Sequence, residues 1–137
     1  MTITAYIDGL SEPSNPGTGT YGFVIYEGNK KLAEGSGLAG YDVTSNFAEY
    51  TALVEALTRL KALGVEGDVL VRSDSKLLVG QMNEEWKVKG GMYVGKLKEA
   101  RDLMKGFGSI RFEWLPREQN QEADLLTRIA YDKHRRR

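Results

Sequence analysis

The chain contains no cysteine, only three prolines and a single histidine, and its formal net charge is zero. The lack of cysteine excludes disulfides, thiolate zinc sites and catalytic thiolates. No apolar run approaches the ~20 residues that a membrane span needs. The N-terminal residues do not resemble a signal peptide, because Tyr6, Asp8 and Glu12 interrupt any apolar stretch and no basic segment precedes it. From these absences we expect a cytoplasmic protein without a membrane partner.

The composition is that of one folded domain covering residues 1–137, with 41% hydrophobic and 28% charged residues. A zero net charge counts mildly against a nucleic-acid partner. The distribution of charge matters more, because lysines and arginines gather between Trp86 and Lys105 and again in residues 133–137. The sequence leaves open whether this basic tail binds a substrate or is disordered.

Three β-rich stretches with short connections indicate an antiparallel meander at the start of the chain. The predicted strands are residues 2–9, 20–27 and 30–38. The pair Gly28-Asn29 predicts a tight turn between the second and third strands. Residues 40–45 are expected to form a loop.

The rest of the chain alternates between helical and strand patterns. Asn46, with Glu49 three residues later, matches a capping box that opens a helix, and Gly64 ends it. Further predicted elements are a strand at 67–74, helices at 75–83 and 92–105, a strand at 108–115 and a helix at 120–131. Right-handed crossovers place the fourth strand parallel to the first. We therefore predict an α/β fold of order βββαβαβα, with a mixed five-stranded sheet (three antiparallel strands, then two parallel) flanked by helices.

Four acidic residues occupy positions that this topology brings together. Asp8 and Asp74 end strands one and four, so both emerge at the carboxyl edge of the sheet, where open α/β sheets bind ligands. Glu49 falls about 20° from Leu60 on the helical wheel, which places it at the margin of the apolar face. Asp124 begins the last helix beside an apolar face. Glu55 points the other way and serves as a contrast.

Converging carboxylates repel one another, and each resists ionisation near another negative charge. Hard cations such as Mg²⁺ relieve this repulsion and prefer oxygen ligands. Two such ions can assist phosphodiester hydrolysis without cysteine or a serine triad. A structural alternative stays open, since Glu49 and Asp124 can be ordinary partners of a helix dipole and a strand-end aspartate can be a turn residue.

Four motifs resemble those of type I ribonuclease H in order and spacing. They are YIDG at 6–9 followed by NPG at 15–17, TSNFAEY at 44–50, RSDS at 72–75, and WLPREQNQEADLL at 114–126. The resemblance spans almost the whole chain and implies the fold predicted above. It also implies that Asp8, Glu49, Asp74 and Asp124 are catalytic ligands of two Mg²⁺ ions, with Mn²⁺ a plausible substitute. The implied reaction is endonucleolytic cleavage of the RNA strand of an RNA–DNA hybrid, giving 5′-phosphate and 3′-hydroxyl ends.

Two departures from the family pattern point to a particular branch. Many members carry a histidine in the loop before the last acidic residue, where this chain has Arg117; its one histidine is His134. Arginine cannot act as a base, so we expect Arg117 to orient phosphate or to help the leaving group depart, unless it is a surface residue. The segment between Asp74 and Leu103 leaves little room for the basic protrusion of some members, which predicts weaker or more salt-sensitive binding.

Several residues near the carboxylates are candidates for contacting 2′-hydroxyls or phosphates of the hybrid. The candidates are Asn15, Asn46, Ser75, Lys76, Trp86, Lys87 and Lys89. Each has a structural alternative: Asn15 as a turn residue, Asn46 as a helix cap, and Trp86 as part of the core edge. Such contacts address the backbone and predict no sequence-specific reading of bases.

Other functions remain compatible with the same motifs. A related nuclease could cut double-stranded RNA or junction DNA, or act from an end. A non-catalytic hybrid-binding module would be expected to lack at least one carboxylate, and none is missing. A structural domain with ordinary caps predicts no Mg²⁺-dependent cleavage. We expect a monomer.

Overall fold

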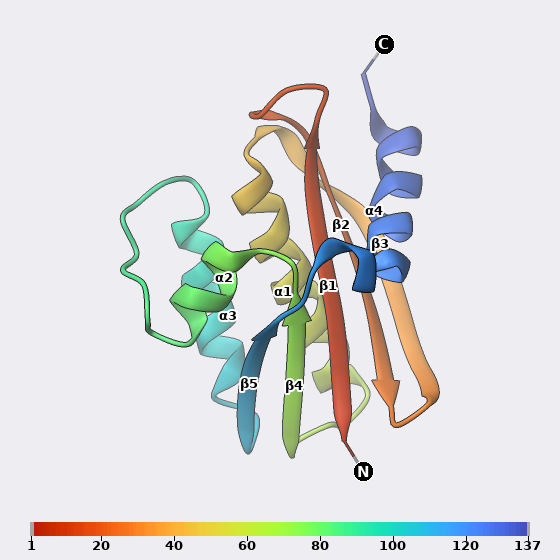
Figure 1. Cartoon of the computed structure of the whole chain (residues 1–137), viewed down its shortest axis with the longest axis vertical. Helices are drawn as coiled ribbons and strands as arrows, with labels where there is room; N and C mark the ends of the chain where they lie inside the picture. The colour runs from red at the N-terminus through yellow and green to blue at the C-terminus, as the bar shows by residue number, and fades with distance from the viewer. Residues whose placement is uncertain (1, 137) are drawn as a thin grey trace.

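The computed structural model describes residues 2–136 and contains a five-stranded sheet. Figure 1 shows helices on both faces of this sheet. The strands lie in the order β3-β2-β1-β4-β5, with β1, β2 and β3 antiparallel and β1, β4 and β5 parallel. The predicted mixed sheet is therefore confirmed. The strands are β1 Ile3–Glu12, β2 Gly17–Glu27, β3 Lys30–Val43, β4 Asp68–Ser73 and β5 Ser109–Trp114. The helices are α1 Ser45–Ala62, α2 Lys76–Met82, α3 Val94–Met104 and α4 Gln121–His134, with a 3₁₀ turn η1 at Arg117–Gln119.

Two helices, α2 and α3, lie between β4 and β5. The sequence analysis predicted both helices. The order βββαβαβα therefore counts α2 and α3 as a single helical connection. None of the helices in residues 2–136 has the length and apolar character to cross a membrane.

Alternation along β2 places α1 and α4 on opposite faces of the sheet. The Tyr21 hydroxyl donates to Glu55 of α1, whereas the neighbouring Gly22 faces the backbone of Ala123 in α4. The main core forms between the sheet and α1, with α3 packed outside α1 (Figure 1). The α4 face is smaller and includes a buried hydrogen bond between the Thr20 hydroxyl and the Thr127 carbonyl, at 2.9 Å.

The expected loop at residues 40–45 was wrong, because β3 continues to Val43. Gly40 pairs with Gly19, and two register shifts in β2 let the ladder reach Gly17. Gly40 suggested a loop, but Gly19 and Gly40 instead leave room for the Val43 side chain, which a Cβ on either glycine would approach within 2.9 Å. The predicted Gly28-Asn29 turn is confirmed, with Gly28 at a φ of 57°.

The predicted cap of α1 was also wrong. Thr44 caps this helix, its side chain accepting from the Phe47 N–H at 3.2 Å, so Asn46 lies inside the helix. Glu49 consequently stands in the second turn and not in the first. The capping-box pattern failed because a better-placed hydroxyl lay two residues upstream. The predicted end of α1 at Gly64 is confirmed, with the C-cap at Leu63.

The basic tail follows α4. His134 ends the helix, and the Arg136 guanidinium lies 4.0 Å from the centre of the Tyr41 ring. The tail therefore packs on the end of β3 as far as Arg136. Arg137, the last residue of the predicted basic cluster, lies outside the described residues.

Candidate active site

Two carboxylates of the site come from neighbouring parallel strands. Ile7 of β1 pairs with Ser73 of β4, so the next residues along the two strands are Asp8 and Asp74. Asp8 is 7% exposed, and Asp74 is half-buried where the chain leaves β4. The strand–helix–strand crossover thus brings together two residues that are far apart in sequence, as the predicted topology required.

Glu49 joins these two from α1. Carboxylate oxygens of Asp8, Glu49 and Asp74 all lie within 4.8 Å of one another. The close approach depends on Gly9, where an added Cβ would stand 2.5 Å from the backbone nitrogen of Glu49. Any larger residue after Asp8 would push β1 away from α1 and open the cluster.

Asp124 approaches the cluster from the first turn of α4 and contributes to the raised pKa of Asp8. Arg128, one turn later, donates from Nε to both oxygens of Asp124 at 3.2 Å. Asp124 is not within the tight group formed by the other three carboxylates. It therefore extends the site on the side where α4 begins.

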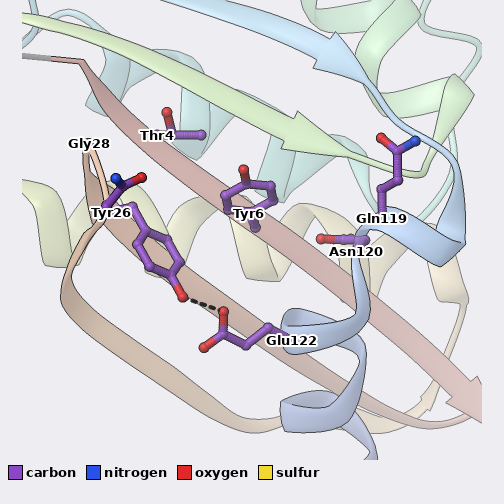
Figure 2. Close-up of a pocket in the computed structure, with 8 residues that line it drawn as sticks. Thr4, Tyr6, Tyr26, Gly28, Gln119, Asn120 and Glu122 are labelled. Carbon is purple, nitrogen blue, oxygen red and sulfur yellow. Dashed lines mark hydrogen bonds between the residues drawn. The ribbon is translucent and has the colours of Figure 1, made fainter.

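The start of α4 is anchored to the sheet beside a cavity of about 370 Å³ (Figure 2). The Tyr26 hydroxyl donates to Glu122 at 2.6 Å, and Lys31 forms an ion pair with the same carboxylate. These contacts fix the helix two residues before Asp124. Glu122 is therefore explained by a structural contact and needs no role in the cluster.

The electrostatics of the cluster indicate a site that requires positive charge. Burial, followed by repulsion from Asp74 and Glu49, raises the pKa of Asp8 to about 9. Burial likewise raises the pKa of Glu49 to about 7, while a hydrogen bond from Ser75 opposes the shift. Burial also raises the pKa of Asp74, and the positive charge of Arg117 opposes it. Without a cation the cluster holds protons that a divalent ion would displace.

The structure places Arg117 and the one histidine of the chain, His134, far apart. Arg117 is exposed in η1, and its positive charge lies close enough to oppose the rise in the pKa values of both Asp74 and Glu49. His134 lies at the far end of α4, where its carbonyl accepts from the Tyr41 hydroxyl at 2.8 Å. Of these two side chains, only Arg117 lies near the carboxylates.

Asn120 is a site residue that the sequence analysis missed. It is 1% exposed, and its Nδ2 donates to the carbonyl of Ile7 at 2.8 Å, directly before Asp8. Asn120 also opposes the rise in the pKa of Asp74. The Asn120 Oδ1 has no hydrogen-bond partner within residues 2–136. Its position next to the helix that carries Asp124 was the available clue.

Comparison with known proteins agrees with this fold. The family described as "Reverse transcriptase-like" matches residues 7–130. A ribonuclease HI of Halobacterium salinarum is 35% identical over 95% of this chain and 64% of its own length. The crystal structure of LC11-RNase H1, solved in complex with an RNA/DNA hybrid, has 35% identity and a TM-score of 0.89, and the match covers 96% of this chain and 98% of that one.

The chain belongs to the type 1 ribonuclease H family.

A bifunctional protein of Mycobacterium tuberculosis is 37% identical over 96% of this chain but only 36% of its own length. The chain thus spans about a third of the first curated relatives it matches, and less than two thirds of the ribonuclease HI from Halobacterium salinarum. Ribonuclease H domains therefore occur within longer chains among these relatives.

The candidate substrate residues of this ribonuclease H domain fall into two groups. Asn15 and Ser75 both hold helix starts. The Asn15 side chain accepts from the Ser45 N–H and donates to its hydroxyl, both at 3.0 Å, and the Ser75 hydroxyl accepts from the Leu78 N–H at 3.1 Å. Asn15 therefore has a structural role, because its side chain links the β1–β2 connection to the start of α1.

The second group lies around α2 and the loop that follows it. Asn46, Trp86, Lys87 and Lys89 line one cavity of about 540 Å³. Lys76 instead lies 5.0 Å from the centre of the Trp114 ring, on the side toward β5. The structure thus brings four of the candidates together in one cavity and places Lys76 in a neighbouring one, which Trp86 also lines.

Proposed function

We propose that this domain hydrolyses the RNA strand of RNA–DNA hybrids endonucleolytically, leaving 5′-phosphate and 3′-hydroxyl ends. The observation that carries the proposal is the convergence of Asp8, Glu49 and Asp74 within 4.8 Å, with Asp124 beside them. The relatives named ribonuclease H, and the neighbour whose structure contains an RNA/DNA hybrid, support the choice of substrate.

The donor set fits two hard divalent cations, Mg²⁺ with Mn²⁺ as a substitute. All the donors are carboxylate oxygens, and the raised pKa values of Asp8 and Glu49 mark sites where negative charge lacks a counterion. Divalent ions bound there supply charge stabilisation for the attacking water and the leaving oxygen. The four carboxylates would hold these ions, and Asn120 holds the β1 backbone in place directly before Asp8.

Selection of the hybrid would rest on backbone features of the two strands. The 2′-hydroxyl distinguishes RNA from DNA, and a hybrid exposes it in a wide minor groove. Asn46, Trp86, Lys87 and Lys89 share one cavity, and Asn46 lies one helical turn before Glu49. Asn15, Ser75 and Lys76 complete the proposed contact set. These groups suit sugars and phosphates and predict little sequence preference.

Matched duplexes of one sequence test this substrate assignment. We expect the hybrid to be cut in the presence of Mg²⁺, and duplex DNA to be left intact. Faster cleavage of double-stranded RNA or of a DNA junction would instead assign the domain to another nuclease of the same fold. Binding of the hybrid without cleavage would assign it to a binding module.

Arg117→Ala is expected to slow hybrid cleavage on the order of tenfold or more while leaving metal affinity unchanged. The reason is that Arg117 is a fixed positive charge beside Asp74 and Glu49, where a phosphate would approach. Single-turnover rates at saturating hybrid measure the effect. Arg111→Ala, at an exposed arginine of β5, is the matched control. An unaltered rate for Arg117→Ala would show that Arg117 is a surface residue without a role in cleavage.

One chain supplies all four carboxylates, which supports a monomeric enzyme. Size-exclusion chromatography with light scattering tests this proposal, since a dimer with higher activity would contradict it. The cytoplasmic location and the single-domain organisation over residues 1–137 stay predictions from sequence.

A further inference from the structure

The loop between α2 and α3, residues 83–93, carries the aromatic and basic residues of the proposed binding cavity. It arcs away from the sheet beside α2 (Figure 1). Trp86 is 47% exposed, and Lys87 and Lys89 are exposed. An exposed loop of this kind normally loses conformational freedom when a ligand orders it, and that loss weakens binding. The contacts that hold the loop before binding therefore matter for affinity.

Gly80 of α2 holds the first part of the loop. Its carbonyl accepts from the N–H groups of Glu85 and Trp86 at 2.9 and 3.1 Å. The indole of Trp86 lies directly over Gly80, where an added Cβ would stand 2.5 Å from Cδ2 of the ring. Trp86 thus packs against α2 at Gly80 even though about half of its surface is exposed.

Gln81 holds the second part. Its side chain is 1% exposed, and Nε2 donates both to the Lys87 carbonyl at 3.2 Å and to the Tyr93 hydroxyl at 2.9 Å. Within residues 2–136, this amide is the only group that hydrogen-bonds the backbone of residues 87–90. Both hydrogens of the amide are therefore used to join the middle of the loop to its end.

The same side chain connects the loop to the helix that carries Glu49. Gln81 Oε1 accepts from the Tyr50 hydroxyl at 2.7 Å, and Tyr50 directly follows Glu49 in α1. The rings of Tyr50 and Tyr93 stack with centroids 5.4 Å apart and planes 16° apart. A buried chain of contacts therefore runs from the carboxylate helix through Gln81 to Lys87.

We propose that Gln81 is a positioning residue for hybrid binding, which holds Lys87 at a fixed place relative to Glu49 so that its ammonium group meets a backbone phosphate. This inference rests on the proposed function. Gln81 touches neither the substrate nor the reacting atoms, and it acts through the loop. Its loss releases residues 87–90 and leaves Lys87 free to sample positions away from the phosphate.

The test compares hybrid binding by Gln81→Met, Lys87→Ala and the double variant, all in an Asp74→Asn background that prevents cleavage. Methionine keeps the length of glutamine and removes its hydrogen bonds. We expect Gln81→Met to weaken binding about tenfold at low salt. If Lys87 meets one phosphate, each single variant should reduce the slope of log affinity against log salt by about one. The double variant should bind no more weakly than the weaker single variant.

Two more variants separate positioning from folding. Tyr93→Phe keeps the ring stack and the bond from Gln81 to Lys87 but removes the bond from Gln81 to the Tyr93 hydroxyl, so it should weaken hybrid binding less than Gln81→Met does. Gly80→Ala would put a Cβ 2.5 Å from the Trp86 indole, so it should weaken hybrid binding by displacing Trp86, and the melting temperature of each variant shows whether the protein remains folded. In the active background, Gln81→Met should raise KM about tenfold with kcat nearly unchanged.

The results separate the two proposals. If the wild type is active but Gln81→Met keeps the parental affinity and salt slope, the role of Gln81 is wrong while the proposed function stands. The same holds if the losses of affinity in Gln81→Met and Lys87→Ala multiply in the double variant. A wild-type protein that neither binds nor cleaves hybrid overturns the proposed function, and this inference with it.

Discussion

Replacing Asp8 by asparagine should lower hybrid cleavage by several orders of magnitude while hybrid binding is retained. Asp8 lies at the centre of the cluster, in contact with the charges of Asp74, Glu49 and Asp124. Asparagine keeps the shape of the side chain but removes the negative charge that a divalent ion requires. The measurement is the single-turnover rate on a labelled hybrid, with binding measured on the same molecule.

Glu55→Gln is the matched control for this prediction. Glu55 lies on α1 with Glu49, but it accepts a hydrogen bond from Tyr21 on the other side of the helix, at 3.3 Å. We expect its cleavage rate to stay close to that of the wild type. Equal rates for Asp8→Asn and the wild type would reject the assignment of this carboxylate.

The same Asp8→Asn variant should be more stable than the wild type when metal is absent. The folded protein raises the pKa of Asp8 from its ordinary 3.8 to about 9, so the folded state keeps a proton that the unfolded chain releases. Stability of the metal-free wild type should therefore fall as pH rises from about 4 toward about 9. Asparagine removes the part of this dependence that comes from Asp8, while the raised pKa values of Glu49 and Asp74 keep the rest. Melting temperatures in a chelator at pH 5 and pH 8 check it, and a wild type that becomes more stable over this range would contradict it.

Removal of divalent metal is the second change with a large expected effect. A chelator should abolish hybrid cleavage, and Mg²⁺ or Mn²⁺ should restore it, because the carboxylates alone repel both one another and the phosphate. Binding to the folded state alone should also stabilise the fold, by about 1.4 kcal/mol when free Mg²⁺ is ten times its Kd.

A thermal melt with and without Mg²⁺ at pH 8 measures this stabilisation. The wild type should melt at a higher temperature with the ion, and Asp8→Asn should show a smaller shift. Full cleavage in excess chelator would show that the cluster does not act through a divalent ion. Equal shifts in both proteins would place the bound ion elsewhere.

Residues placed by regular topology were predictable from the sequence. Asp8 and Asp74 were expected to be neighbours because a right-handed crossover makes their strands parallel, and the register of β1 and β4 confirms the pairing. Glu49 was expected at the core margin from its helical angle, and it lies beside both.

Residues placed by long-range contacts were not predictable from local patterns. Nothing near Asn120 in sequence shows that its amide meets the carbonyl of Ile7, a contact set by the packing of η1 against β1. The bridge from Asn15 to Ser45 joins the β1–β2 connection to the start of α1, which are distant in sequence. The choice of Thr44 over Asn46 as the helix cap likewise depended on how the chain enters α1 from the extended β3.

Anomalous diffraction from crystals grown with Mn²⁺ and an RNA–DNA hybrid tests the central claim most directly. The account predicts two manganese peaks within about 2.5 Å of carboxylate oxygens of Asp8, Glu49, Asp74 and Asp124, with the hybrid backbone beside them. Manganese bound elsewhere, with the four carboxylates empty beside an ordered hybrid, would contradict it.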